Sequence, residues 1–300
     1  MTLTFFARAE NVGRKLNGDD DILYGRDGQA RLNSDLPEIL AALRAFQSEQ
    51  IDLASSLFYT ADVLANLVGN ENGFRLDFPY HHPSRLEAKR RIEACAYPHV
   101  ALQEVCAERK DSVVPAQDLA GSSILYTGLA HIESETGRAE QAQTPADSLK
   151  SAVKRYERGD ILFAKMRPNL RKVALMHFDE PGFTSPECAV LAVRRTADDK
   201  PAIDPVLLSI LLRSDFVFGQ IMHLVAGIGR PRIGSGELLA VRIPVPPPDE
   251  QRTIIEAFCS ASESATRLEE EGLALQRQAR AALTTAVATV ADSFARRKQN

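Results

Sequence analysis

The sequence has no uninterrupted run of 18 or more apolar residues, so no segment is long enough to cross a membrane as a helix. Its first residues, Met1-Thr-Leu-Thr-Phe-Phe-Ala-Arg8, lack the basic segment and long apolar core of a secretory signal. The four cysteines lie far apart and form no C-x-x-C pair, which argues against a disulfide framework and against a zinc site. They are Cys95, Cys106, Cys188 and Cys259. We therefore expect reduced thiols in a cytoplasmic protein.

Patterns for a bound metal or nucleotide are also missing. The acidic stretch Asp19-Asp20-Asp21 follows neither the D-x-[DN]-x-[DN]-G pattern of a calcium loop nor its closing Glu. His81 and His82 are adjacent, and neighbours in regular structure do not face one metal, so we expect two surface residues. The glycine-rich loop 227–236 contains no G-x-G-x-x-G, and we expect no helix directly after it. The sequence predicts no metal and no cofactor.

The composition is that of a globular protein. Of 300 residues, 44% are hydrophobic and 25% charged, and the length suits about two domains. A strand is expected at residues 3–7 and a helix from Ser34 or Asp35, with Pro37 in its first turn. Residues 51–68 are apolar enough to predict a second helix. The break Gly69-Asn-Glu-Asn-Gly73 is the expected first domain boundary.

Short strands alternate with turns between residues 97 and 245. A helix beginning at Pro83 and Ser84 precedes them, and a longer helix is expected over 204–225. We predict an α+β fold with a mixed, β-rich domain at 74–247, after a small, mainly helical region at 1–73. The expected strands are 100–105, 123–126, 161–163, 173–175, 188–193 and 239–243.

A basic turn lies between two of these strands. Residues 150–172 hold eight Lys or Arg against two acids, Glu157 and Asp160, in a chain of net charge -4. Such a concentration of positive charge suits a polyanion such as DNA. The alternative is a solvated hairpin whose charges have no partner. The main candidates are Lys165, Arg167, Arg171 and Lys172, with Lys154 and Arg155 secondary. Arg167 has a second interpretation, an internal ion pair with Asp160.

Two further arginines, Arg230 and Arg232, lie in the glycine-rich loop. Together with the backbone N–H groups of this loop they are candidates for a phosphate contact. An ordinary glycine loop is the competing interpretation.

The C-terminal region predicts one long helix at 248–300, after the rigid stop Pro244-Val-Pro-Pro-Pro248. Apolar or small residues recur at alternating steps of four and three, which is the seam of a coiled coil. The phase then slips by an inserted step of four, a stutter that locally unwinds a supercoil. The alternative is a helix packed on its own globule. The largest residues of the proposed partner face are Ile254, Phe258, Leu268, Leu275, Leu283 and Val287.

Three segments together resemble the specificity (S) subunit of type I restriction–modification systems. Arg75-Leu-Asp, Tyr80 and Pro83 resemble its R-[LF]-D-x-x-Y-x-x-P opening. Ile243-Pro-Val-Pro-Pro-Pro-Asp-Glu-Gln-Arg-Thr-Ile-Ile255 is similar to its I-P-[LV]-P-P-x-x-E-Q-x-x-I entry into a long helix. Its G-D-[IL]-L-x-x-[KR]-[IM]-R-P-x-x-x-K segment is matched by Gly159-Asp-Ile-Leu-Phe-Ala-Lys-Met-Arg-Pro-Asn-Leu-Arg-Lys-Val-Ala174. The match covers residues 74–300.

Residues 1–50 have a resemblance of their own. Phe6-Ala-Arg-Ala-Glu-Asn-Val-Gly13 and Asn33-Ser-Asp-Leu-Pro-Glu-Ile-Leu40 are similar to the C-terminal end of an N6-adenine DNA methyltransferase (M) subunit. The [DN]-P-P-[YF] tetrapeptide of adenine methylation and the glycine-rich turn for S-adenosylmethionine are missing. The resemblance therefore implies a chain without catalytic residues.

The resemblance implies a sequence-specific DNA-binding subunit that directs methyltransferase and nuclease partners to a target site. An S subunit normally carries two recognition domains and two long helices. This chain has one of each, which implies a half-subunit that dimerises through its long helix and contacts two half-sites. There are two alternatives to this interpretation. The first is a fragment of a fused restriction–methylation enzyme, and the second is a coiled-coil adaptor with a degenerate recognition domain.

Overall fold

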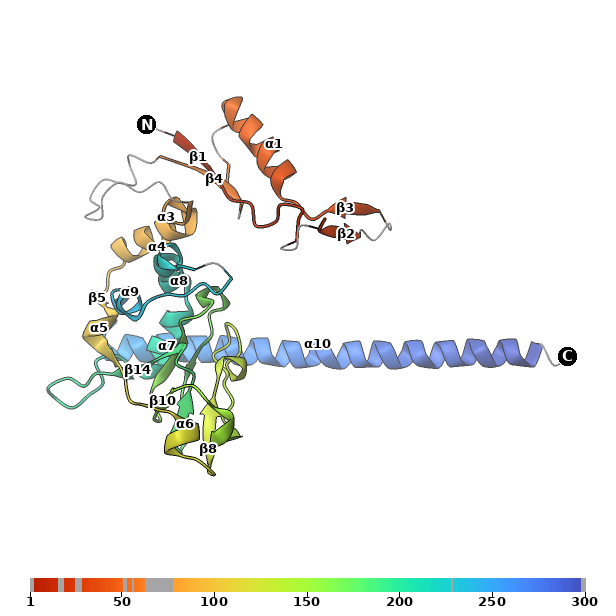
Figure 1. Ribbon diagram of the computed structural model, residues 1–300. Coiled ribbons are helices and arrows are strands. Elements are labelled where there is room, and N and C mark those ends of the chain that lie inside the picture. The colour runs from red at the N-terminus through yellow and green to blue at the C-terminus, as the bar shows by residue number, and fades with distance from the viewer. Residues whose placement is uncertain are drawn as a thin grey trace. The chain divides into compact units, whose positions relative to one another are not determined.

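The computed structural model describes residues 3–15, 19–24, 29–50, 53–55, 57–62, 78–227 and 229–297 (Figure 1). The expected break at 69–73 lies outside these residues. The chain forms two compact units, Met1–Val245 and Pro246–Asn300. The first unit contains several small sheets and short helices, and the second is a single long helix. The predicted α+β fold is confirmed.

The N-terminal part of the first unit is built on a pair of strands. β1 (Leu3–Ala7) pairs antiparallel with β4 (Phe58–Asp62), and Tyr59 is fully buried against Phe6. The stretch 51–68, predicted to include a second helix, forms a strand at 58–62, and its residues 63–68 lie outside the described residues. Aromatic and β-branched residues favour a strand there, and the distant partner β1 supplies the pairing. α1 (Leu36–Gln47) starts where the sequence predicted, and β2 (Ile22–Tyr24) pairs antiparallel with β3 (Ala30–Leu32).

A layer of helices follows. α3 (Phe78–His81) and α4 (Pro83–Glu93) precede the sheets, and α7 (Pro205–Arg213) and α8 (Asp215–Ile221) pack near them. The single helix expected over 204–225 is wrong. Ser214 has extended backbone angles and its hydroxyl donates to Leu211 O, so the helix ends there and a new one begins. No single helix among the described residues is long and apolar enough to span a membrane. The bent pair formed by α7 with the segment 215–224 has the length and composition of a broken span, but five of its large apolar residues are buried inside the first unit: Leu207, Leu208, Leu212, Val217 and Ile221.

His81 corrects another expectation. We predicted a surface residue, but its side chain is fully buried and its ring stacks on Phe6 at 5.0 Å. Its neighbour His82 is half-buried and accepts a hydrogen bond from Ser84 N, which caps the start of α4. The side chain of His81 therefore joins the N-terminal strands to the helical layer.

Two sheets form the β-rich part. The four-stranded sheet has the order β12-β11-β14-β6, and all its pairs are antiparallel. The five-stranded sheet has the order β7-β10-β13-β8-β9. The bounds are β6 (Cys106–Glu108), β7 (Ser112–Val113), β8 (Ser123–Thr127), β9 (Ala142–Pro145), β10 (Val153–Tyr156), β11 (Ile161–Ala164), β12 (Val173–Leu175), β13 (Gly182–Thr184) and β14 (Cys188–Val193). Leu162, Tyr156 and Val190 belong to a buried core cluster that contains residues of both sheets.

Two predicted strands are only partly right. β5 (His99–Ala101) ends early, and α5 (Leu102–Val105) follows because Glu104 accepts a hydrogen bond from Ala101 N at 2.7 Å. The strand expected at 239–243 is β15 (Arg242–Pro244), which pairs with β5. α9 (Ser235–Leu239) precedes it, so a short helix does open directly after the glycine-rich loop. The remaining short helices are α6 (Pro115–Asp118), η1 (Leu129–His131), η2 (Ala146–Ser148), η3 (Pro168–Leu170) and η4 (Met222–Leu224).

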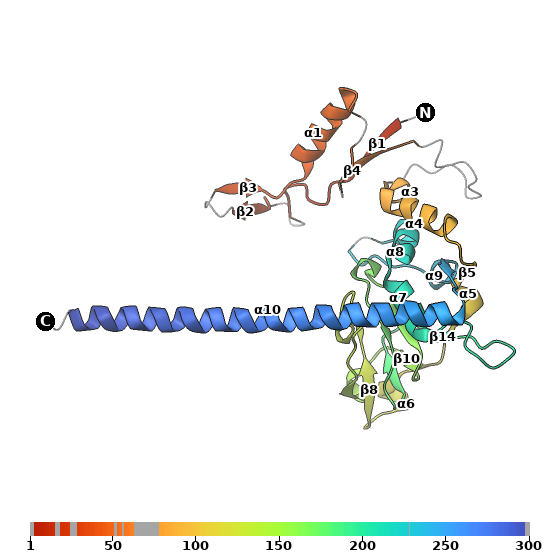
Figure 2. The same ribbon diagram turned by 180° about the vertical axis from the view of Figure 1, so that it is seen from behind.

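The second unit is α10 (Pro248–Arg297), an uninterrupted helix of 50 residues (Figures 1 and 2). At 1.5 Å per residue its length is about 75 Å. Its apolar seam is open to solvent, with exposed fractions of 66% for Leu268, 65% for Leu275 and 66% for Leu283. Large exposed apolar residues that recur along one stripe are typical of a helix that pairs with another helix.

Candidate nucleic-acid interface

The basic turn connects the two strands β11 and β12. β11 is fully buried, and Ala164 N donates to Lys172 O at 2.9 Å where the strands separate. Arg167 and Arg171 have left-handed backbone angles, with φ of 51° and 49°, on either side of η3. Such angles are uncommon outside glycine and lead the backbone through a compact turn.

The glycine-rich loop lies against this turn. Arg167 N donates to Pro231 O at 2.8 Å, and Ile233 N donates to Lys165 O at 3.1 Å. An isolated bridge also joins Met166 to Arg232. The two basic segments, more than 50 residues apart in the chain, therefore form one surface. We call it the basic surface, defined by residues 165–172 and the described part of 226–233.

Two of the lysines predicted to contact DNA, Lys154 and Lys165, bind groups within the first unit. Lys154 Nζ lies 2.8 Å from Glu108 Oε1 and 2.9 Å from Cys188 O. Lys165 Nζ lies 3.2 Å from Ser235 Oγ and 3.9 Å from Glu108 Oε1. The exposed fractions of the side chains are 15% for Lys154, 19% for Lys165 and 8% for Glu108. Both lysine side chains are therefore mostly covered by the protein.

The electrostatics of this cluster follow from burial. Desolvation raises the pKa of Glu108, but hydrogen bonds from Lys154 and Ser235, and the charges of Lys154 and Lys165, lower it overall. Burial lowers the pKa of Lys165, and the charge of Lys154 acts in the same direction. Glu108 therefore serves as the shared counter-charge of two lysines.

Two further candidates tie the turn to neighbouring elements. Arg171 donates to Asp215 Oδ1 at 2.7 Å and to Arg213 O at 3.2 Å, and its guanidinium stacks over Phe218 at 4.2 Å. Lys172 Nζ donates to Leu129 O at 2.7 Å. Arg171 connects the turn to the start of α8, and Lys172 connects it to η1.

Three of the eight candidates are exposed without an ion pair in the part of the chain that the structure describes. They are Arg155, Arg167 and Arg230. Arg167 and Arg230 belong to the basic surface, whereas Arg155 lies on β10 in the other sheet. Arg167 makes only a long contact of 3.5 Å to Gly229 O. Their guanidinium groups are available to a partner.

Arg232 is intermediate between these two groups. It forms a two-pronged ion pair with Glu187, at 2.8 Å and 2.5 Å, while 47% of its side chain stays exposed. The hydrogen bond from Arg232 lowers the pKa of Glu187, and the charge of Arg230 contributes in the same direction. Glu187 therefore anchors the glycine-rich loop to the segment before β14.

The alternative pairing of Arg167 with Asp160 is wrong. The Asp160 carboxylate accepts hydrogen bonds from Arg109 Nε and from Glu157 N, both at 2.8 Å. Arg109 comes from the end of β6 and was not among our candidates. Glu108 and Glu187 were also missed, because both lie outside the basic stretch and nothing local marks them as its counter-charges.

Comparisons with known proteins found similar solved structures. No protein-family model and no curated protein matches the chain. One similar solved structure describes the complex assembly and conformational transition of the type I R-M system. It is 26% identical to this chain, the match covers 59% of this chain and 45% of that chain, and the TM-score is 0.49. The crystal structure of the HsdS subunit from Thermoanaerobacter tengcongensis is similar at 25% identity, over 59% and 46%, also with a TM-score of 0.49. The chain spans less than half the length of each.

Proposed function

We propose that the chain is a non-catalytic DNA-recognition subunit of a type I restriction–modification system. The observation that carries the proposal is the meeting of two basic segments that are distant in sequence. The segment that resembles the S-subunit family supplies the turn with Arg167, and the glycine-rich loop supplies Arg230. Exposed arginines on a rigid turn suit phosphate contacts and contacts to guanine O6 and N7.

The division of roles among the cations supports this proposal. Lys165, Arg171 and Lys172 hold the turn in place through contacts within the first unit, and Lys154 shares the counter-charge Glu108 with Lys165. Arg167, Arg230 and, after exchange of its ion pair, Arg232 are then available for duplex DNA. A turn held by buried contacts presents its arginines with little loss of conformational entropy on binding.

The partners follow from the same proposal. An M subunit carries out methylation, an R subunit translocation and cleavage, and a second copy of this chain pairs through α10 and supplies a second half-site. Double-stranded DNA is the common ligand. The exposed seam of α10 supports the pairing, because isolated apolar stripes of this length are unfavourable in water.

The DNA test uses the full chain, alone and with its M subunit, and a random duplex pool. We expect enrichment of a specific site. We then expect Arg167→Gln or Arg230→Gln to weaken binding to that site by about tenfold, because each charge-assisted contact contributes about 1–3 kcal/mol. Binding is measured by fluorescence anisotropy at several salt concentrations. Loss of a phosphate contact lowers the salt slope by about one.

Arg195→Gln is the matched control, because Arg195 is exposed and paired only with nearby Asp199. It removes the same charge outside the basic surface and is expected to change binding less than twofold. Equal losses in all three variants would contradict a specific basic surface. Absence of enrichment even with the M subunit favours the adaptor, and methylation by the chain alone favours the enzyme fragment.

The pairing of α10 is tested by light scattering. The wild-type chain is expected to run as a dimer, and Leu275→Lys as a monomer, because a buried charge at a seam position is costly. Ala281→Lys adds the same charge at an exposed position on the opposite side of the helix and is expected to leave the dimer intact. A monomeric wild-type chain would contradict the homodimer and would mean that the seam of α10 pairs with another protein.

A further inference from the structure

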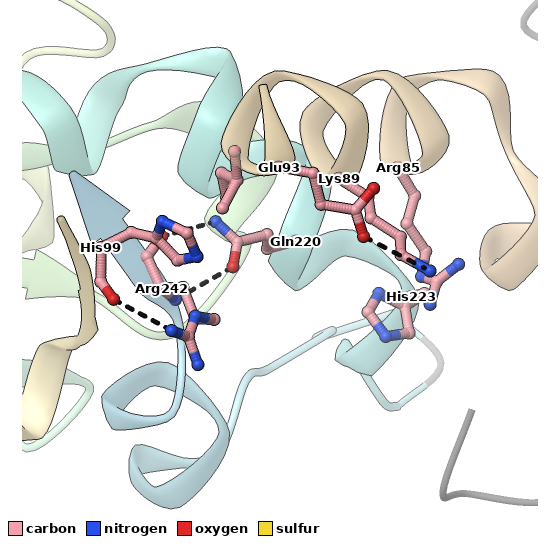
Figure 3. A pocket seen from close by; sticks show the side chains of 8 residues that line it. Arg85, Lys89, Glu93, His99, Gln220, His223 and Arg242 are labelled. Atoms are coloured by element: carbon pink, nitrogen blue, oxygen red, sulfur yellow. Dashed lines mark hydrogen bonds and ion pairs between the residues drawn. The ribbon is translucent and has the colours of Figure 1, made fainter. Parts of the chain in front are cut away.

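A second cationic site lies within the first unit, in a pocket of about 350 Å³ (Figure 3). It is lined by residues of α4, β5, α8, η4 and β15, and its volume is within the range of small-ligand sites, about 300–1,000 Å³. None of its residues belongs to the basic surface. The lining residues are Arg85, Lys89, Ile92, Glu93, His99, Gln220, His223 and Arg242.

The arginine on α4 is held in position. Arg85 Nη1 donates to Tyr80 O at 3.1 Å, and its guanidinium lies over the Tyr80 ring at 3.8 Å. Figure 3 shows the Arg85 side chain extending toward His223. Stacking on an aromatic ring fixes the plane of a guanidinium while leaving several of its N–H groups for a ligand.

The arginine on β15 is held from the opposite wall. Arg242 Nη2 donates to His99 O at 2.9 Å. Gln220 binds both the N–H and the carbonyl of Arg242, at 2.9 Å and 2.8 Å, which fastens this strand to α8 (Figure 3). The two guanidinium groups therefore reach the pocket from separate, braced elements.

The charge balance of the lining is strongly positive. The lining contains three cations, Arg85, Lys89 and Arg242, and one carboxylate, Glu93, which forms an ion pair of 3.8 Å with Lys89. Two imidazoles and an amide supply the other polar groups. The three cations of the lining therefore outnumber its one carboxylate, although the whole chain has a net charge of -4.

We propose that this pocket binds a phosphate group. Planar guanidinium groups donate paired hydrogen bonds to phosphate oxygens, and Lys89 adds a point charge. The phosphate comes either from a small free ligand, such as a nucleotide, or from the backbone of DNA bound to the same unit. The site does not depend on the DNA-recognition proposal, since the first source needs no DNA.

The test is isothermal titration of the full chain with inorganic pyrophosphate, repeated with Arg242→Gln and with Lys89→Gln. We expect saturable binding at one site, weakened by about tenfold or more in each variant, because each removes a charge-assisted hydrogen bond. Arg90→Gln is the matched control. Arg90 is the exposed neighbour of Lys89 on α4 and does not line the pocket.

The second arm identifies the source of the phosphate. The same variants are titrated with a duplex of 20 to 30 base pairs, with and without pyrophosphate. Weaker DNA binding in Arg242→Gln and Lys89→Gln, together with competition by pyrophosphate, assigns the pocket to a DNA phosphate. Pyrophosphate binding without any effect on DNA assigns it to a free ligand. Thermal melting confirms that each variant is folded. The proposal is overturned if Arg242→Gln and Lys89→Gln bind both pyrophosphate and DNA as tightly as Arg90→Gln does.

Discussion

Replacing Glu108 with glutamine is expected to lower the free energy of unfolding by about 3 kcal/mol. Glu108 is the counter-charge of Lys154 at 2.8 Å and of Lys165 at 3.9 Å, and all three side chains are at most 19% exposed. A buried ion pair that loses one partner leaves an uncompensated charge, which costs about 3–5 kcal/mol. Urea unfolding at pH 7 measures the loss.

The exposed pair provides the control. Glu187→Gln breaks the ion pair with Arg232, whose side chain is 47% exposed, and is expected to cost at most about 1 kcal/mol. Equal losses in the two variants would contradict a shared buried counter-charge at Glu108.

The pH dependence gives a second readout of the same prediction. The pKa of Glu108 is lower in the folded chain, because the hydrogen bonds and charges of its partners outweigh burial. A lowered pKa contributes stability above the unfolded value, about 4.3, and this stability is lost as the pH falls through the folded value. The difference between wild type and Glu108→Gln is therefore expected to be largest near pH 7 and to narrow below pH 4.

Gly219→Ala is expected to destabilise the first unit by about 2 kcal/mol, although alanine favours a helix. A Cβ at Gly219 would lie 2.5 Å from Ser84 O and 2.6 Å from the Cβ of Ala88. The first of these is a backbone atom of α4, so α4 and α8 must move apart. Overpacking of this kind costs about 1–3 kcal/mol, more than the gain of about 1 kcal/mol in helix propensity.

Gly236→Ala is the matched control, because Gly236 is also helical, in α9, and has no atom within 4 Å of an added Cβ. It is expected to be neutral or slightly stabilising. Gly219→Ala has a further consequence. Arg85 and Lys89 lie on α4 and Gln220 on α8, so separation of these helices is also expected to weaken pyrophosphate binding. Equal stability of the two glycine variants in thermal melting would rule out the close helix contact.

The sequence by itself predicted the elements whose signals are local. The β11–β12 hairpin follows from two apolar runs around a basic turn, and α4 follows from Pro83 and Ser84 at its start. The long helix α10 follows from its proline stop and its heptad pattern. In each case propensity, capping and periodicity agree within one short segment.

The tertiary structure decided what depends on distant partners. Residues 58–62 form a strand because β1 pairs with them, and Ser214 divides a run that is apolar enough to be one helix. The same holds for function. Lys165 and Arg167 are two residues apart in one basic stretch, yet Glu108 and Ser235 bury the first while the second stays exposed beside the glycine-rich loop. Whether a cation holds the fold or is available to a ligand depends on which counter-charge the chain brings to it, and that pairing is long-range.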